Sequence, residues 1–311
     1  MSAGSQYQGP WPNGAKAAIA LTIDNMGEAA DLDRGLWPED QPIGNHFSVK
    51  EVLPQFLSIL KKYDIKATYF VESWNLTVYP DAIAKQIAAA GHEIGWHAWR
   101  HEAWSKLKDA DVEHANIARS FGPEGLAGFL AEGAPGEGIT DIYKGFRPPG
   151  GIVHGERSLK LFREYALKYL SPAGNDAAIV SIDEGKDSII VLPFRWSTVD
   201  AYYYMETFGK LRQIKGDLPE EPQTEEVLKK HYIAQIDRAI AEGGYLSFLF
   251  HPFLNNKPER LQVFEDVVKY LAEKRDSNDI WLARCCDVTD WISSNPGIVG
   301  TDPALDETTW R

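Results

Sequence analysis

The chain contains short apolar runs that are typical of strands buried on both faces, and several of them end at a polar residue. Residues 17–23 form one such run, which ends at Asp24, and residues 245–250 form another, which ends at His251. Segments between the runs, such as 49–63, repeat their apolar residues at helical spacing. This alternation predicts parallel βα units, and we expect a single α/β domain.

Polar side chains stand at the ends of four predicted strands. They are Asp24, the pair His97 and His101, Arg147 and His251. In parallel α/β barrels the carboxyl ends of the strands form the face that carries the active site. We therefore expect these side chains to converge on one pocket.

The histidine pair lies in the stretch GHEIGWHAWRH, residues 91–101. Within this stretch, the pair follows a short apolar run that predicts the end of a strand. On one turn of helix, residues four apart lie on the same face, so the imidazoles of His97 and His101 could reach one divalent cation. Zinc and similar metals favour nitrogen ligands of this kind. An isolated HxxxH pair is a weak signal, and the metal hypothesis depends on the other strand-end residues.

The composition argues against several classes of partner. A formal net charge of −13 over 311 residues opposes binding to nucleic acid or to an anionic membrane, because its long-range field repels polyanions. No run has the length of a transmembrane helix. Residues 1–16 have neither a basic n-region nor an apolar h-region, so we expect no secretory signal. The two cysteines, Cys285 and Cys286, are adjacent and do not predict a disulfide framework. These features predict a cytoplasmic protein.

Five motifs occur in the order seen in a known family. They are TID ending at Asp24, ATYFV from Ala67, GHEIGWHAWRH from Gly91, FRPPGG from Phe146 and LFHP from Leu249. Together they resemble the polysaccharide deacetylases, the NodB-homology proteins of carbohydrate esterase family 4. The chain closely resembles the branch with intracellular peptidoglycan deacetylase-like and cofactor-free allantoinase-like enzymes. PFRWSTVDAYYY, residues 193–204, resembles that branch's W-x-x-D-D-x-P-Y element, with Val199 and Asp200 at the acidic pair.

The resemblance runs from about Ala17 to Trp291 and implies one deacetylase-like domain, residues 17–295, between an N-terminal arm (1–16) and a C-terminal tail (296–311). It implies a distorted (β/α)7-type barrel. The expected reaction is hydrolysis of a carbon–nitrogen bond, in particular of an N-acetyl group, in a carbohydrate or small amide. The expected partners are a small-molecule or oligosaccharide substrate and further copies of the chain in a homo-oligomer.

The resemblance also assigns catalytic roles. Asp24 resembles the general base, and Arg147 resembles the residue that keeps this base ionised and oriented. His251 resembles the general acid that protonates the leaving amine, a role that suits a side chain titrating near neutrality. We expect the substrate to be bound by Trp196, Asp200, Glu28 and Pro149.

His97, His101 and Asn25 stand at the positions of the metal ligands, which in the family hold a divalent metal; here we expect zinc, with cobalt or nickel as alternatives. Asn25 is a departure, because the family usually has a second aspartate there and a neutral amide oxygen binds a dication more weakly. Glu28 or Asp24 itself could complete the site instead.

Three hypotheses therefore stay open. The first is a metal-dependent deacetylase. The second is a hydrolase of cyclic amides or ureides that needs no metal and is allantoinase-like, in which Asp24, Glu28 and His251 transfer the protons. The third is a carbohydrate-binding pseudo-enzyme that has lost turnover together with the second aspartate.

Overall fold

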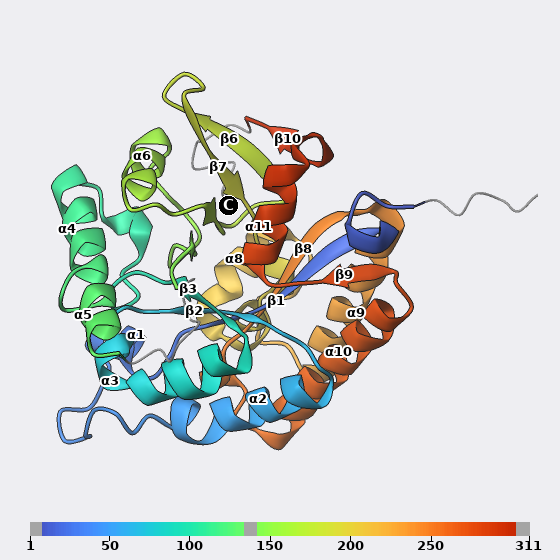
Figure 1. Ribbon diagram of the computed structural model, residues 1–311. Helices are drawn as coiled ribbons and strands as arrows, with labels where there is room; N and C mark the ends of the chain where they lie inside the picture. The colour runs from blue at the N-terminus through green and yellow to red at the C-terminus, as the bar shows by residue number, and fades with distance from the viewer. Residues whose placement is uncertain (1–7, 134–141, 303–311) are drawn as a thin grey trace, which may run out of the picture.

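The computed structural model describes residues 8–133 and 142–302. Its centre is a curled sheet (Figure 1), to which the described residues contribute strands in the order β10-β6-β7-β5-β4-β3-β2-β1-β8, with β9 also beside β1. Paired strands run parallel, except that β6 and β7 are antiparallel. The strands are β1 (Ala17–Asp24), β2 (Thr68–Val71), β3 (Glu93–Trp96), β4 (Gly145–Phe146), β5 (Tyr169–Leu170), β6 (Ala178–Ile182), β7 (Asp187–Val191), β8 (Gly244–Phe250), β9 (Ile280–Leu282) and β10 (Gly300–Thr301).

The sheet curls into a barrel whose remaining gap is bridged by the chain that follows β7. Ala173 forms an isolated parallel bridge with Phe194, and Val199 forms another with Leu249. The segment from Phe194 to Val199 therefore joins the extension of β5 to β8. Strands β1 to β5, this segment and β8 make up the distorted (β/α)7-type barrel that the family resemblance implies.

Strand β1 is central to the barrel because it pairs with three others. It pairs with β8 along nearly its whole length, from Ala17 to Ile23. On its other edge it pairs with β2 at its carboxyl end and with β9 at its amino end. All three neighbours are parallel to β1, so the carboxyl ends of β1, β2 and β8 meet on the same face. Asp24, the last residue of β1, lies there.

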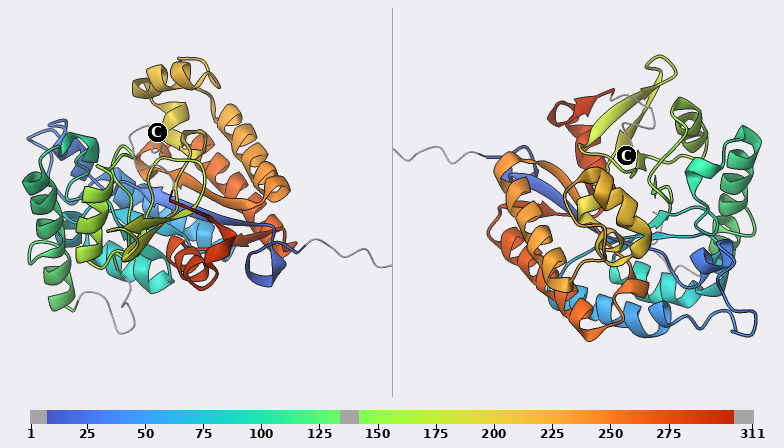
Figure 2. Two further views of the ribbon diagram at one scale, coloured as in Figure 1. Left: turned by 90° about the horizontal axis from the view of Figure 1, so that it is seen from above. Right: turned by 180° about the vertical axis from the view of Figure 1, so that it is seen from behind.

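Helices cover the outside of the barrel in two main groups (Figures 1 and 2). α10 packs against both α2 and α9 on one side, and α4, α5 and α6 lie on another. The helices are α1 (Ala29–Asp33), α2 (Leu53–Lys62), α3 (Asn75–Val78), α4 (Ala110–Phe121), α5 (Leu126–Ala131), α6 (Glu156–Glu164), α7 (Asp200–Tyr204), α8 (Gly209–Lys215), α9 (Glu225–Glu242), α10 (Pro258–Asp276) and α11 (Cys285–Ser294). No helix of the described residues is long and apolar enough to cross a bilayer.

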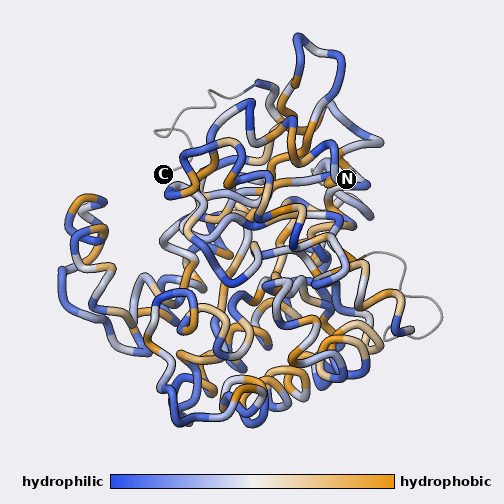
Figure 3. The backbone as a smooth tube through the Cα atoms, turned by 90° about the vertical axis from the view of Figure 1, so that its left-hand side faces the viewer, coloured by the Kyte–Doolittle hydropathy of each residue, from blue (hydrophilic) through white to orange (hydrophobic). Residues whose placement is uncertain are grey.

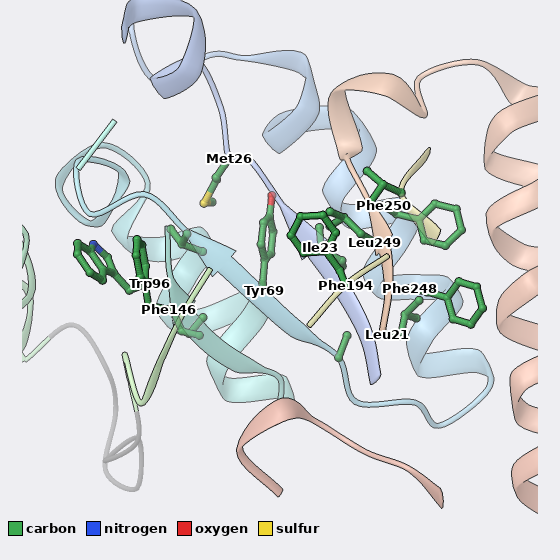
Figure 4. Close-up of a cluster of buried hydrophobic side chains, with 14 of the residues drawn as sticks. Leu21, Ile23, Met26, Tyr69, Trp96, Phe146, Phe194, Phe248, Leu249 and Phe250 are labelled. Atoms are coloured by element: carbon green, nitrogen blue, oxygen red, sulfur yellow. The ribbon is translucent and has the colours of Figure 1, made fainter. Parts of the chain in front are cut away.

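Much of the apolar core lies between the strands and the helices that cover them. Figure 4 shows Phe248 and Phe250 of β8 turned toward the helices, where their rings lie 4.8 and 5.3 Å from that of Tyr232 of α9, and it shows Trp96 beside Phe146 at the neighbouring strands. The rings of Trp96 and Phe146 stack with centroids 4.1 Å apart. Figure 3 shows polar and apolar residues alternating along the outer helices, as expected when only one face of each helix is buried.

Several elements differ from the sequence prediction. The sequence pattern over 105–130 is helical throughout and predicts one helix, but the structure divides it into α4 and α5, because Pro123 follows Gly122 and cannot supply an N–H to continue α4. The polar character of residues 209–223 predicts a loop, but the structure places α8 there. Its Arg212 is buried and donates hydrogen bonds to the carbonyls of Tyr202, Met205, Pro219 and Glu220, which are contacts outside its own helix that no local pattern reveals.

The ends of the chain take part in the fold more than the predicted arm and tail suggest. Trp11 is buried and stacks on Trp281 of β9, with ring centroids 6.2 Å apart. In the predicted tail, Gly300–Thr301 forms β10 and pairs with β6. Cys285 and Cys286 are both free and buried at the start of α11.

Candidate active site

A cavity of about 470 Å³ opens at the carboxyl ends of the barrel strands. Seven of the residues singled out in the sequence line it: Asp24, Asn25, His97, His101, Arg147, Trp196 and His251. They come from the ends of β1, β3, β4 and β8 and from the bridging segment after β7. The expected convergence of strand-end side chains is thus present in the structure.

Arg147 and Asp24 form a buried ion pair at the floor of the cavity. The Arg147 Nη1 donates to Asp24 Oδ1 at 2.9 Å and to Thr22 Oγ1 at 2.6 Å. Its Nη2 donates to the hydroxyls of Ser171 and Ser247, at 2.9 and 3.1 Å. Burial raises the pKa of Asp24 by more than Arg147 and His251 lower it. Asp24 is therefore held in place as a carboxylate that accepts a proton more readily than an exposed aspartate.

The HxxxH segment is not a helix. Ala98 and His101 have left-handed backbone angles, with φ of 65° and 75°, so the chain turns sharply after β3. The turn is held by the backbone amides of Ser73 and Trp74, which donate to the carbonyls of Ala98 and Trp99. The turn still brings the two imidazoles together, because the ring centroids of His97 and His101 are 4.9 Å apart.

Hydrogen bonding and burial set the protonation of the two histidines. His97 Nδ1 lies 2.7 Å from the carbonyl oxygen of Arg147, so Nδ1 donates and Nε2 keeps a free lone pair. Nε2 lies 3.9 Å from Asp24 Oδ2. Burial lowers the pKa of His97 to about 3 and that of His101 well below its usual value. His101 Nδ1 accepts a hydrogen bond at 3.3 Å from Arg34, which lies at the exposed rim.

Asn25 follows β1 in a left-handed conformation, with φ of 59°. Its carbonyl accepts a hydrogen bond from the Tyr69 hydroxyl, whereas its side-chain Oδ1 is buried without a hydrogen-bond partner. Within residues 8–133 and 142–302, no three His, Cys, Asp or Glu side chains form a group that could hold a metal ion. A cation bound by His97 and His101 would need a further ligand of another type, and the unpaired amide oxygen of Asn25 fits that need.

His251 is held by a carboxylate behind it. Asp200 Oδ1 lies 2.5 Å from His251 Nδ1, and Asp200 Oδ2 accepts from the His251 backbone amide at 2.8 Å. Asn255 Nδ2 donates to the same Oδ2 at 2.7 Å. This bonding directs His251 Nε2 toward the cavity. Asp200, expected to bind the substrate, is fully buried and positions His251 instead.

Two other residues expected to bind substrate do not line the cavity. Glu28 is fully buried, and its carboxylate accepts from the Gly44 amide at 2.6 Å and from the Tyr79 hydroxyl at 2.5 Å. Pro149 is buried, and its carbonyl accepts from the Trp104 amide at 3.2 Å. Both therefore support the loops around the cavity.

Sequence reasoning missed two supporting residues, Asn255 and Glu72. Asn255 follows His251 by four residues in LFHPFLNN, and this polar residue in an apolar segment was a usable signal. Glu72 lies just after β2 and holds the turn after β1 by accepting from the Met26 amide at 3.0 Å. Burial raises the pKa of Glu72 to about 8. Its position after the strand ATYFV was visible in the sequence, but its contact with Met26 was not.

Replacing Asp200 with Asn should lower kcat by about 10²-fold while changing KM little. The amide has one acceptor oxygen in place of the two carboxylate oxygens that accept from the backbone N–H and the Nδ1–H of His251, so the imidazole is misoriented. Release of free amine from an amide substrate gives both constants. Glu206→Gln, an exposed change on the segment after α7, is the matched control and should match the wild type. An unchanged kcat in Asp200→Asn would show that His251 does not depend on this carboxylate.

Comparison with known proteins shows similarity to one family over part of the chain. Residues 13–120 match the family model described as polysaccharide deacetylase. The peptidoglycan deacetylase of Helicobacter pylori is 21% identical over 282 residues, which cover 86% of this chain and 89% of that protein. The sequence resemblance to the polysaccharide deacetylases is confirmed.

Solved structures show the same fold across nearly the whole chain. A protein assigned as a polysaccharide deacetylase from Mycobacterium smegmatis superposes with a TM-score of 0.75 at 21% identity, covering 97% of this chain and 98% of that one. A Puue allantoinase superposes with a TM-score of 0.69 at 18% identity, covering 94% and 95% of the two chains. The barrel of this protein is therefore the polysaccharide deacetylase fold, which an allantoinase also has.

Proposed function

We propose that this protein hydrolyses the carbon–nitrogen bond of an amide, in particular an N-acyl group on a carbohydrate or small molecule. One observation carries the proposal: Asp24, paired with Arg147, and His251, held by Asp200, face the same cavity. The cavity thus contains a base that can accept a proton from water and an acid that can donate a proton to the leaving nitrogen, and amide hydrolysis uses both.

In the proposed reaction, Asp24 accepts a proton from a water molecule, and the water oxygen forms a bond to the carbonyl carbon. The carbon–nitrogen bond then breaks as His251, in its imidazolium form with Nδ1–H donated to Asp200, gives its Nε2 proton to the leaving nitrogen. The products are a carboxylic acid and an amine, so one water is consumed for each bond broken; Asp24 then releases its proton and His251 regains one. Arg147 fixes the Asp24 carboxylate, and Asp200 fixes the ring of His251 and stabilises its imidazolium form.

We further propose that His97, His101 and the Asn25 amide oxygen hold a divalent metal, with zinc first and cobalt or nickel as alternatives. Such a cation supplies Lewis acidity at the scissile carbonyl and lowers the pKa of water. Support comes from the neutral state that burial gives both imidazoles and from the unpaired Asn25 Oδ1. Ligation through His101 requires that its contact with Arg34 loosens, since Arg34 occupies the Nδ1 lone pair.

The alternative hydrolysis of cyclic amides or ureides uses the same acid and base. Two observations favour keeping it as the second candidate: Asn25 is neutral, and the fold is shared with an allantoinase. In that case Asp24 and His251 act without Glu28, whose carboxylate is buried away from the cavity.

Metal content decides between the two candidates. We expect about one zinc, cobalt or nickel per chain in protein purified without chelator or added metal, and almost none in the His97→Ala, His101→Ala double variant, because both nitrogen ligands are removed. Elemental analysis measures the content. His114→Ala with His231→Ala, two histidines outside the cavity lining, is the matched control and should retain the metal. Near-zero metal in the wild type, unrecovered on adding divalent ions, would contradict the metal site and favour cyclic ureides as substrates.

A further inference from the structure

We propose that the amide substrate carries an apolar group of ring size next to the scissile bond, rather than the hydroxyl-covered ring of a saccharide. This inference rests on the proposed function, because it concerns what the same cavity binds. It is drawn from the chemistry of the cavity walls away from the acid, the base and the histidine pair.

One wall of the cavity is apolar and is built by the bridging segment, the chain around α7 and α8, and the end of β8. Its side chains, which we call the apolar wall, are Phe194, Trp196, Met205, Phe208, Leu249 and Phe253. Trp196 lies between two phenylalanines, with ring centroids 5.3 Å from Phe194 and 5.3 Å from Phe208. Three aromatic rings therefore stand side by side along this wall.

The apolar wall reaches the residue that protonates the leaving nitrogen. The ring of Phe253 lies 5.4 Å from the ring of His251, centroid to centroid. Leu249 lies in β8 two residues before His251, which follows the strand in an extended conformation, and both line the cavity. A group attached to the reacting amide at His251 thus lies directly against apolar surface.

Polar partners for sugar hydroxyls are scarce inside the cavity. The polar side chains at its centre are the proposed catalytic and metal-binding ones, which act on the scissile amide and are not free to bind sugar hydroxyls. The remaining polar or charged lining residues, Asp33, Arg34, Lys106 and Thr207, are all exposed at the rim. One face of a sugar ring can pack on Trp196, but hydroxyls turned toward the apolar wall would lose their hydrogen bonds to water without replacement.

The cavity is also large enough for an apolar ring in addition to the amide. Its volume is about 470 Å³, whereas an apolar cavity of roughly 150 Å³ accommodates benzene. Half-buried Trp196, Phe208 and Phe253 would be covered further by such a group. Covering apolar surface in this way favours binding.

Two acetamides of equal ring size test the inference, N-cyclohexylacetamide and N-acetylglucosamine. They share the amide and a saturated six-membered ring, and they differ in the hydroxyls and the ring oxygen. We expect the purified wild-type protein to bind N-cyclohexylacetamide at least about tenfold more tightly in isothermal titration, because only that ring can cover the apolar wall at no cost in lost hydrogen bonds.

A double variant tests whether the preference for N-cyclohexylacetamide depends on the apolar wall. Met205→Ser with Phe208→Ser should weaken binding of N-cyclohexylacetamide about tenfold and leave that of N-acetylglucosamine nearly unchanged. Both residues are half-buried at the cavity edge, so the fold should tolerate the change. Ile214→Ser is the matched control, since Ile214 lies on α8 with 78% of its surface exposed and does not line the cavity.

Tighter binding of N-acetylglucosamine, or an unchanged affinity of the double variant for N-cyclohexylacetamide, would overturn the inference. These outcomes are distinct from a failure of the proposed function. That failure would appear as wall-dependent binding of the acetamide with no release of amine from any amide tested.

Discussion

Replacing His251 with Gln should lower kcat by about 10²- to 10⁴-fold, because the leaving nitrogen then has no proton donor in the cavity. The fold should persist. Asp200 keeps the backbone amide of residue 251 and the Asn255 side chain as hydrogen-bond donors, and glutamine fills a similar volume. Amine release under saturating substrate, together with a urea unfolding curve, measures both effects.

His114→Gln is the control for this prediction, because it makes the same chemical change at an exposed position of α4. It should leave kcat at the wild-type value. If His251→Gln retained more than about a tenth of the wild-type kcat, acid catalysis by His251 would be ruled out as the main contribution. If His251→Gln still bound the ligand, and neither this variant nor the wild type hydrolysed any amide, the binding-protein hypothesis would be favoured.

The sequence predicted the barrel well where the information is local. β1 and β8 begin and end within a residue of the predicted runs, because a strand buried on both faces is nearly continuous in apolar residues and the polar residue after the run marks its end. The short strands β4 and β5 and the antiparallel pair β6 and β7 give weaker signals. β5 has only two residues, and its pairing depends on neighbours far away in the chain.

In the candidate site, too, features set by local sequence were predicted and those set by distant contacts were not. The residues at strand ends line the cavity as predicted, because parallel strands bring their carboxyl ends to one face. The turn at His97 to His101 was predicted as helical because spacing alone cannot reveal the left-handed angles at Ala98 and His101. The orientation of Asp200 was also out of reach, since it depends on His251, 51 residues later in the chain.

Glu28 shows why a motif cannot assign roles to loop residues by proximity alone. It is three residues beyond Asn25, yet its carboxylate is drawn away by the Tyr79 hydroxyl and the Gly44 amide. Those partners fix the long loop between β1 and α2 above the barrel. A carboxylate already engaged by two donors and excluded from solvent is a structural group, and other parts of the same loop, such as Arg34 at the rim, line the cavity instead.

Replacing Arg147 with Met should destabilise the protein by about 3–5 kcal/mol, because Asp24 would remain buried without its cation. The hydroxyls of Thr22, Ser171 and Ser247 would lose their guanidinium donor at the same time. Hydrolysis should also fall to background, since a buried carboxyl without a cationic partner takes up a proton and can no longer act as a base. Urea unfolding and amine release measure the two losses.

The surface variant Arg238→Met is the control for this loss of stability. Arg238 pairs with Glu242 on α9, both side chains are more than half exposed, and an exposed pair of this kind contributes about 0.3–0.5 kcal/mol. A loss in Arg147→Met no larger than this would contradict the inferred strength of the buried pair.

Combining Arg147→Met with Asp24→Asn separates the two roles of the ion pair. The neutral amide removes the unpaired charge, so the double variant should be more stable than Arg147→Met alone, with a coupling of more than about 1 kcal/mol in the double-mutant cycle. Activity should stay at background in the double variant, because the amide introduced at position 24 cannot accept a proton from water. Recovery of stability without recovery of hydrolysis would show that the unpaired charge of Asp24 destabilises Arg147→Met, and that hydrolysis needs the Asp24 carboxylate itself.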